Sequence, residues 1–212
     1  MITVWGEGRG LRVVWLLEEM GLPYRLRQVD LSKKLEDSDP EFLSINPGGF
    51  IPAMTDGDVT MVESIAIMEY LMGRYGPTKL APAPSDPRYP GYLQFMLLGE
   101  AGLATAVYYV FGARHIAPPD QRDNWTAGQA LRGFGTRMRL VKRQLERAPY
   151  MAGEAFTAAD ISVSYALLLS KRAGGIVLDD AVKAYLARTT ARDAYKRALD
   201  VCTATRDSAP AD

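Results

Sequence analysis

The sequence predicts a chain of mixed class, with an α/β domain at residues 1–77 and an all-α domain at residues 88–205. Three observations support this division. Strand-like and helix-like segments alternate over about the first 75 residues, which is typical of α/β proteins. Five prolines then fall between Gly76 and Pro90, as in a stiff, extended linker. Beyond this linker, apolar residues recur with the period of a helix.

The first segments are expected to form two parallel strands joined by a helix. Residues 2–5 (ITVW) are β-prone, and residues 24–31 alternate between two faces as a strand does. Between them, residues 11–20 are apolar on two sides of a helix, which Gly21 ends as a C′ glycine would. A helix that connects two strands of one sheet favours their parallel pairing.

A short helix, a hairpin and a longer helix complete the expected order β-α-β-α-β-β-α. Residues 40–45 predict the short helix. The triplet Asp-Gly-Asp at 56–58 separates two strand-like runs, 52–54 and 59–61, and is typical of an antiparallel hairpin. Residues 64–75 carry apolar side chains three and four positions apart, and they predict the last helix of this domain.

The second domain is expected to contain only helices. Gly174-Gly175 should stop its buried helix, and the tail beyond Cys202 should fray. The apolar patterns predict helices over residues 92–103, 125–145 (basic on its outer face), 161–169 (almost wholly apolar, and therefore buried), 180–186 and 191–201.

The composition narrows the class of protein. The chain has 25 Lys and Arg against 25 Asp and Glu, and this neutrality argues against a nucleic-acid partner. Its one cysteine, Cys202, allows no internal disulfide and favours a reducing, cytoplasmic location. His115, the one histidine, lacks metal-ligating neighbours, so we expect no metal site. No apolar run approaches the ~20 residues of a membrane span, so we expect no membrane partner.

Two motifs indicate a ligand site in the first domain. In NPGGFIP (46–52), Pro52 stands at the start of an apolar strand, where it removes a backbone donor. In VESIAIMEYL (62–71), Glu63 and Ser64 stand at the start of a helix, whose free N–H groups attract anions. The alternative is a structural role, in which Pro52 shapes the turn, Ser64 caps the helix and Glu63 favours its dipole.

These two motifs, together with RVVWLLEEMGLPY (12–24) and MAGEAFTAADISV (151–163), occur in the order found in the soluble, bacterial-type glutathione S-transferases, which the chain resembles. The resemblance implies a thioredoxin-like N-terminal domain, an all-helical C-terminal domain, glutathione as co-substrate, and a homodimer. In the last motif, Thr157-x-x-Asp160 is a capping box, to which we assign a structural role.

The resemblance also implies which residues bind glutathione. Pro52 corresponds to a cis-proline, and the N–H and C=O of Ile51 before it would pair with the cysteine backbone of glutathione, as an added strand does. Glu63 and Ser64 would hold the γ-glutamyl end.

The sequence departs from the family at the glycine carboxylate of glutathione. Phe50 stands where the family often has a basic or amide residue, and it cannot bind that carboxylate. Lys33 or Lys34, in the loop after the second strand, is the expected replacement, and we select Lys34.

The usual thiol-activating side chain is also missing. Serine-type members have a serine four residues before the arginine that corresponds to Arg12, and here that position is Gly8. The thiol pKa of glutathione must fall by about two units for ionisation at neutral pH, or about 2.7 kcal/mol. We expect Arg9 and the backbone N–H groups around Gly8 to supply this; a solvated Arg9 in a flexible glycine loop is the alternative.

The electrophile would bind between the two domains. Tyr108, Tyr109 and Phe111 are expected to line that pocket, with Trp5 near its mouth. Aromatic residues at helical spacing are equally typical of a core or a subunit interface.

The leading functional prediction is glutathione transfer, in which the bound thiolate attacks a small apolar electrophile. Two alternatives stay open. One is another glutathione-dependent activity, such as ether cleavage, dehalogenation or peroxide reduction. The other is a transferase-like binding or interaction module without catalysis, which Gly8 and Phe50 favour.

Overall fold

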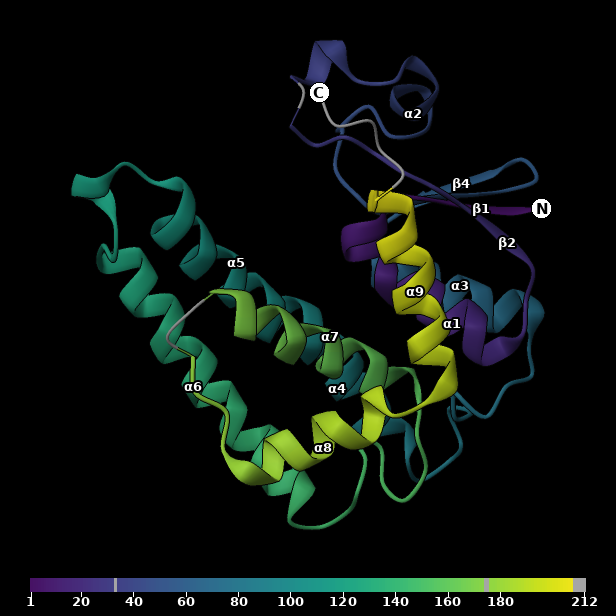
Figure 1. The fold of residues 1–212 in the computed structure, drawn as a ribbon. Coiled ribbons are helices and arrows are strands. Elements are labelled where there is room, and N and C mark those ends of the chain that lie inside the picture. The colour runs from purple at the N-terminus through teal and green to yellow at the C-terminus, as the bar shows by residue number, and fades with distance from the viewer. Residues whose placement is uncertain (33, 174–175, 208–212) are drawn as a thin grey trace. The chain divides into compact units, whose positions relative to one another are not determined.

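The computed structural model of the protein describes residues 1–32, 34–173 and 176–207 (Figure 1). It divides into two compact units, which we describe separately. The N-terminal unit comprises residues 1–78 together with residues 191 onward, and the helical unit comprises residues 79–190. The domain limits expected from the sequence, 1–77 and 88–205, stay a prediction.

The N-terminal unit is built on a four-stranded sheet with the order β2-β1-β3-β4. Strands β1 (Ile2–Trp5) and β2 (Tyr24–Arg27) are parallel, whereas β3 (Ala53–Asp56) and β4 (Val59–Val62) form an antiparallel hairpin. The predicted pairing of the strands is therefore confirmed, and β1 joins the hairpin by pairing antiparallel with β3.

Strand β2 is shorter than predicted, because it ends at Arg27 rather than at residue 31. In the register of the sheet, Trp5 is the last residue of β1 and lies opposite Arg27. The chain turns at Gly6, whose N–H donates to the Arg27 carbonyl at 2.7 Å. The alternating pattern continues to the buried Val29, but β1 offers no further partner there.

Three helices and a short 3₁₀ turn, η1 (Leu35–Asp37), complete the first 78 residues: α1 (Glu7–Met20), α2 (Pro40–Ile45) and α3 (Ser64–Tyr75). Helix α1 begins four residues earlier than predicted, because its first turn contains Gly8 and Gly10 and has no apolar pattern. Gly21 ends α1 in the left-handed conformation, as predicted.

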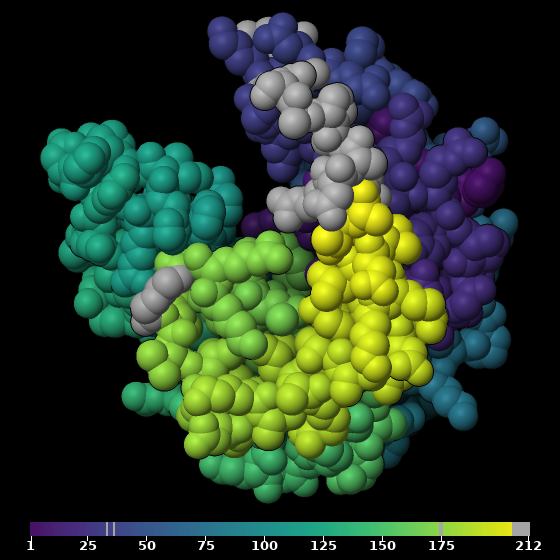
Figure 2. Space-filling view, viewed as in Figure 1, coloured from purple at the N-terminus to yellow at the C-terminus, as the bar shows by residue number. Residues whose placement is uncertain are grey.

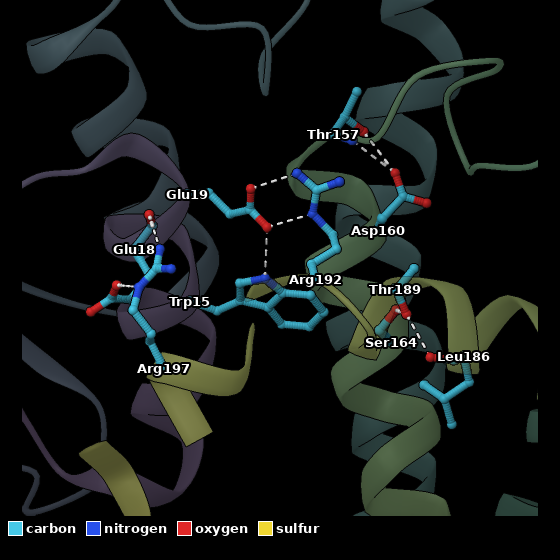
Figure 3. Close-up of polar contacts among 10 residues, drawn as sticks. All are labelled: Trp15, Glu18, Glu19, Thr157, Asp160, Ser164, Leu186, Thr189, Arg192 and Arg197. Carbon is cyan, nitrogen blue, oxygen red and sulfur yellow. Dashed lines mark hydrogen bonds and ion pairs between the residues drawn. The ribbon is translucent and has the colours of Figure 1, made fainter. Parts of the chain in front are cut away.

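The last helix of the chain, α9 (Asp193–Asp207), also belongs to the N-terminal unit and packs on α1. The guanidinium of Arg192 binds both carboxylate oxygens of Glu19, at 2.6 and 2.7 Å, and Arg197 binds Glu18 at 2.6 Å (Figure 3). The rings of Trp15 and Tyr195 meet edge to face, 4.7 Å apart. The prediction that the chain frays after Cys202 is wrong as far as Asp207, because the buried Cys202 helps to continue the packed face.

The helical unit has a long helical run, Tyr89–Ile116, followed by three helices: α6 (Trp125–Leu145), α7 (Ala158–Ala173) and α8 (Asp180–Thr190). The run consists of α4 (Tyr89–Leu97), η2 (Leu98–Ala104), α5 (Thr105–Phe111) and η3 (Gly112–Ile116), and a short turn, η4 (Pro119–Gln121), follows it. The turn region between α5 and α6 (teal) stands out from the rest of this unit (Figure 2).

Helix α7 is buried, as predicted, and it is longer than the predicted 161–169. It lies so close to η2 that a Cβ added at Gly99 would be 2.2 Å from Ser162 Oγ, and Ser162 donates to the Met96 carbonyl at 2.8 Å. The predicted stop at Gly174-Gly175 falls outside the described residues.

The capping box before α7 is present and fully buried. Asp160 accepts hydrogen bonds from the N–H and hydroxyl of Thr157 (Figure 3). It also accepts from the Met151 N–H and from the Tyr185 hydroxyl. Burial raises the pKa of this carboxyl to about 6.

Among the described residues, one helical run, Tyr89–Ile116, is long and apolar enough to cross a membrane by length and composition alone. The prediction that no apolar stretch reaches this length is therefore wrong. In the structure, 44% of its most apolar window is buried within the protein, as in the core helix of a globular domain.

Candidate functional site

The starts of α1 and α3 and the turn before β3 come together in the N-terminal unit. The Ile51–Pro52 peptide bond is cis, as predicted, and Pro52 is buried directly before β3. A Cβ added at Gly6 would lie 2.3 Å from Ile51 Cγ2, and one added at Gly8 would lie 3.3 Å from Ile51 Cδ1. The backbone at the start of α1 therefore rests against Ile51, which the absence of side chains at these glycines permits.

The backbone of Ile51 is open to a further partner. Within residues 1–32, 34–173 and 176–207, neither its N–H nor its C=O forms a hydrogen bond. Since Pro52 also lacks an N–H, this edge offers one donor and one acceptor side by side to an extended peptide.

Asn46 holds the turn that presents Ile51, a role that we did not predict. It is 3% exposed; its side chain donates to the Phe50 carbonyl at 2.5 Å and accepts from the Gly48 N–H at 3.0 Å. The local signal for such a turn was the sequence Asn-Pro-Gly-Gly. Phe50 itself is 45% exposed.

The start of α3 is not closed by a side chain from the described part of the molecule. Glu63, exposed and with a φ of 69°, is its N-cap, and its carbonyl accepts from the Ile67 N–H at 2.9 Å. The N–H groups that precede Ile67 therefore lie outside the internal bonds of the helix. Such a helix start attracts an anion.

The hydroxyl of Ser64 is set by Arg12 and does not cap α3. Arg12, on α1, is fully buried, and its Nη1 donates to Ser64 Oγ at 2.6 Å. A hydroxyl has one hydrogen to donate, so an oxygen that accepts from Arg12 keeps this hydrogen for another partner. Because 52 residues separate the two, no local pattern reveals the pair.

The start of α1 offers backbone groups only. Its N-cap is Gly6, and no side chain among the described residues caps it. Gly8 is exposed in the first turn and Arg9 beside it is half-buried, so both lie in the segment that rests on Ile51. The roles predicted for Gly8 and Arg9 in thiol activation stay predictions.

Lys34 is exposed on a loop that contacts the same turn. It precedes η1, and the neighbouring Leu35 packs so closely on Gly49 that a Cβ there would be 2.2 Å from Leu35 Cδ1. The loop therefore lies beside the Asn-Pro-Gly-Gly turn. Lys33 falls outside the described residues.

The residues predicted to line an electrophile pocket have different environments. Trp5 is 2% exposed, since it packs with Val29, Phe42 and Ala53, so it is a core residue rather than a pocket residue. Tyr108 and Tyr109 on α5 are 56% and 53% exposed, while the half-buried Phe111 stacks on His115 at 4.8 Å. A pocket lined by the last three aromatics stays a prediction.

The protein combines a thioredoxin-like unit, which has an open edge next to a cis-proline, with a helical unit. This combination is typical of a class of glutathione-binding proteins. Comparison with known sequences identifies the same class. Residues 10–73 match the family model for the glutathione S-transferase N-terminal domain. Glutathione S-transferase PM239X14 of Arabidopsis thaliana is 31% identical over 160 residues, or 71% of each chain. GstB of Escherichia coli K12 is 27% identical over 77% of this chain and 80% of its own. The chain belongs to the glutathione S-transferase family.

One further relative and two solved structures are also similar to this chain. The glutathione S-transferase-like protein gedE of Aspergillus terreus is 49% identical over 78 residues, which span 33% of that protein. The bacterial glutathione transferase BphK superposes with a TM-score of 0.81 at 26% identity, covering 95% of this chain and 99% of its own. A theta-class enzyme of Xanthomonas axonopodis pv. citri, solved with glutathione bound, gives 0.77 at 26% identity over 93% of this chain and 96% of its own.

Proposed function

We propose that the protein binds glutathione in its N-terminal unit and transfers the thiolate to a small apolar electrophile. The observation that carries the proposal is the open backbone of Ile51 beside the start of α3, where Arg12 orients the Ser64 hydroxyl.

In this proposal each part of glutathione meets a matching group. The backbone of its cysteine pairs with the N–H and C=O of Ile51. Its γ-glutamyl carboxylate takes the open N–H groups of α3 and the Ser64 hydroxyl, and the exposed Glu63 binds its ammonium. The ammonium of Lys34 binds the glycine carboxylate.

Thiol activation then falls to the start of α1. A partly buried helix start contributes up to about 2 kcal/mol toward an anion, less than the roughly 2.7 kcal/mol that ionisation at neutral pH requires. Without a hydroxyl at Gly8, the remainder comes from the charge of Arg9. The electrophile is then attacked by a bound, oriented thiolate.

A calorimetric titration with glutathione, followed by thiolate absorbance against pH on the same sample, tests the proposal. We expect binding, a thiol pKa well below that of free glutathione, and turnover of an aryl halide as model electrophile. Absence of binding at millimolar glutathione would overturn the proposal.

A second candidate is a binding module without catalysis. The observation that favours it is at the start of α1. Gly8 lies near Ile51 and has no side chain that could activate a thiol. Glutathione binding with the ordinary thiol pKa and no turnover would select this candidate. Ether cleavage, dehalogenation and peroxide reduction use the same thiolate, and a panel of these electrophiles separates them.

We further propose that the protein is a cytoplasmic homodimer, as its family membership and its one buried cysteine favour. Light scattering after size exclusion measures the mass directly, and a mass of one chain would contradict the dimer.

A further inference from the structure

The outer face of α6 differs from the rest of this neutral chain in its charge. Residues 125–145 contain five Lys and Arg and no Asp or Glu, and the next two residues are Glu146 and Arg147. The helical unit as a whole has 14 basic and nine acidic residues, so it has an excess of five positive charges, which the N-terminal unit offsets. Net charge alone therefore conceals a strongly basic surface.

Four residues lie in one line along this helix: Trp125, Arg132, Arg139 and Arg143. At 100° per residue they fall within a narrow stripe on the side opposite the buried Phe134 and Val141, and the stripe is about 27 Å long. Figure 1 shows α6 running along one side of the helical unit, with α5 and α7 on its inner side. We call this line the α6 stripe.

The arginines of the α6 stripe are exposed and are not neutralised by the described part of the chain. Arg139 and Arg143 form no ion pair there, and Arg132 makes only a 3.4 Å contact with the Gln129 amide. By contrast, Lys142, on the flank of the same helix, pairs with Asp179. Residues beside the stripe are small, such as Gly135 and Thr136, which leaves the guanidinium groups free to reach outward.

Trp125, at one end of the stripe, is 75% exposed, although an indole of this size is usually covered. Trp favours the boundary between lipid headgroups and water, and arginines beside it bind lipid phosphates. The stripe lies on a convex helix surface, whereas single-stranded nucleic acid is bound in basic grooves. A flat, negatively charged surface fits this combination best.

We propose that the α6 stripe docks the protein on membranes rich in anionic phospholipid. This differs from the sequence-based expectation of no membrane partner, which considered only spanning segments; docking lays the helix on the headgroups and inserts nothing but the indole. Each basic residue near such a surface strengthens binding about fivefold, so the three arginines together contribute about a hundredfold.

The test is sedimentation of the full chain with vesicles of phosphatidylcholine alone or with about one-third phosphatidylserine. We expect binding to the anionic vesicles only, and its loss at high salt. The combined variant Arg132→Gln, Arg139→Gln, Arg143→Gln should bind about a hundredfold more weakly, and Trp125→Ala should also weaken binding. The control variant Lys79→Gln, Lys171→Gln, Arg172→Gln removes equal charge from other exposed positions and should bind nearly as the wild type does.

Three results would overturn the proposal: equal or absent binding to both kinds of vesicle, an equal loss in the control variant, or tighter binding of a single-stranded oligonucleotide than of anionic vesicles. Glutathione affinity and the unfolding midpoint should match the wild type in both combined variants, which separates loss of docking from loss of fold.

Discussion

The starts of α7 and α3 show two opposite ways to finish a helix. At α7, Thr157 and Asp160 close the N-terminus, and every partner around the carboxylate is buried. At α3, the N-cap is an exposed glutamate at positive φ, and the one nearby hydroxyl, that of Ser64, is turned to Arg12. A closed start stabilises the fold, whereas an open start beside an unpaired edge is available to a ligand.

The largest effect should come from opening the closed start. Asp160→Ala leaves the N–H groups of Met151 and Thr157 and the hydroxyl of Tyr185 buried without their acceptor. At about 1–3 kcal/mol for each such group, we expect a loss of 3 kcal/mol or more in the free energy of unfolding, measured with urea. A loss below about 1 kcal/mol would remove the capping box from the stability of the fold.

The buried carboxyl of Asp160 should also make the free energy of unfolding depend on pH. Because burial raises the folded-state pKa of Asp160 to about 6, from 3.8, its stabilising contribution is complete below about pH 4. That contribution is lost as the pH rises through about 6, by roughly 3 kcal/mol in total. The difference in unfolding free energy between wild type and Asp160→Asn should therefore fall between about pH 4 and 7. A flat difference would contradict the assignment.

A change at the open start of α3 should lower the affinity for glutathione and leave the stability of the fold unchanged. Ser64→Ala removes the hydroxyl that Arg12 orients, and we expect glutathione binding to weaken by about 1–3 kcal/mol in calorimetry. Asp160→Asn is the matched control, since it changes the closed start and should leave the affinity of the folded protein unchanged. Unchanged affinity in Ser64→Ala would reduce that serine to a structural residue.

The smallest expected effect concerns the start of α1. If the charge of Arg9 lowers the thiol pKa, Arg9→Ala should raise the pKa of bound glutathione by about one unit, or about 1.4 kcal/mol. The thiolate absorbance against pH measures this directly, with Arg74→Ala, an exposed arginine at the far end of α3, as control. An unmoved titration curve would take Arg9 out of the mechanism.

Sequence patterns predicted the features that depend on neighbouring residues, such as helix limits and helix caps. The period of apolar residues located α3 and α6 to the residue, and the family motifs identified the cis-proline and the capping box. The end of β2 was not predictable, because it depends on where β1 ends and leaves β2 without a partner. Trp5 was misplaced for a related reason: a short strand does not reveal that both of its faces are covered.

The site was harder to predict than the fold. The motif indicated Ser64, but the buried guanidinium that orients it comes from a helix 52 residues away. Asn46 is concealed in the same way, since its side chain folds back on Phe50 only once the turn has formed. Pairs that are distant in sequence and side chains that brace a turn have no periodic signature.

The packing of α9 on α1 has a consequence for synthesis. The N-terminal unit cannot cover the face of α1 that carries Trp15 until residues 193–207 have been made, more than 100 residues after its sheet. At about 5–20 residues per second, this delay is on the order of ten seconds. The first 78 residues therefore emerge from the ribosome with the Trp15 face of α1 uncovered, and α9, made much later, is the helix that covers it.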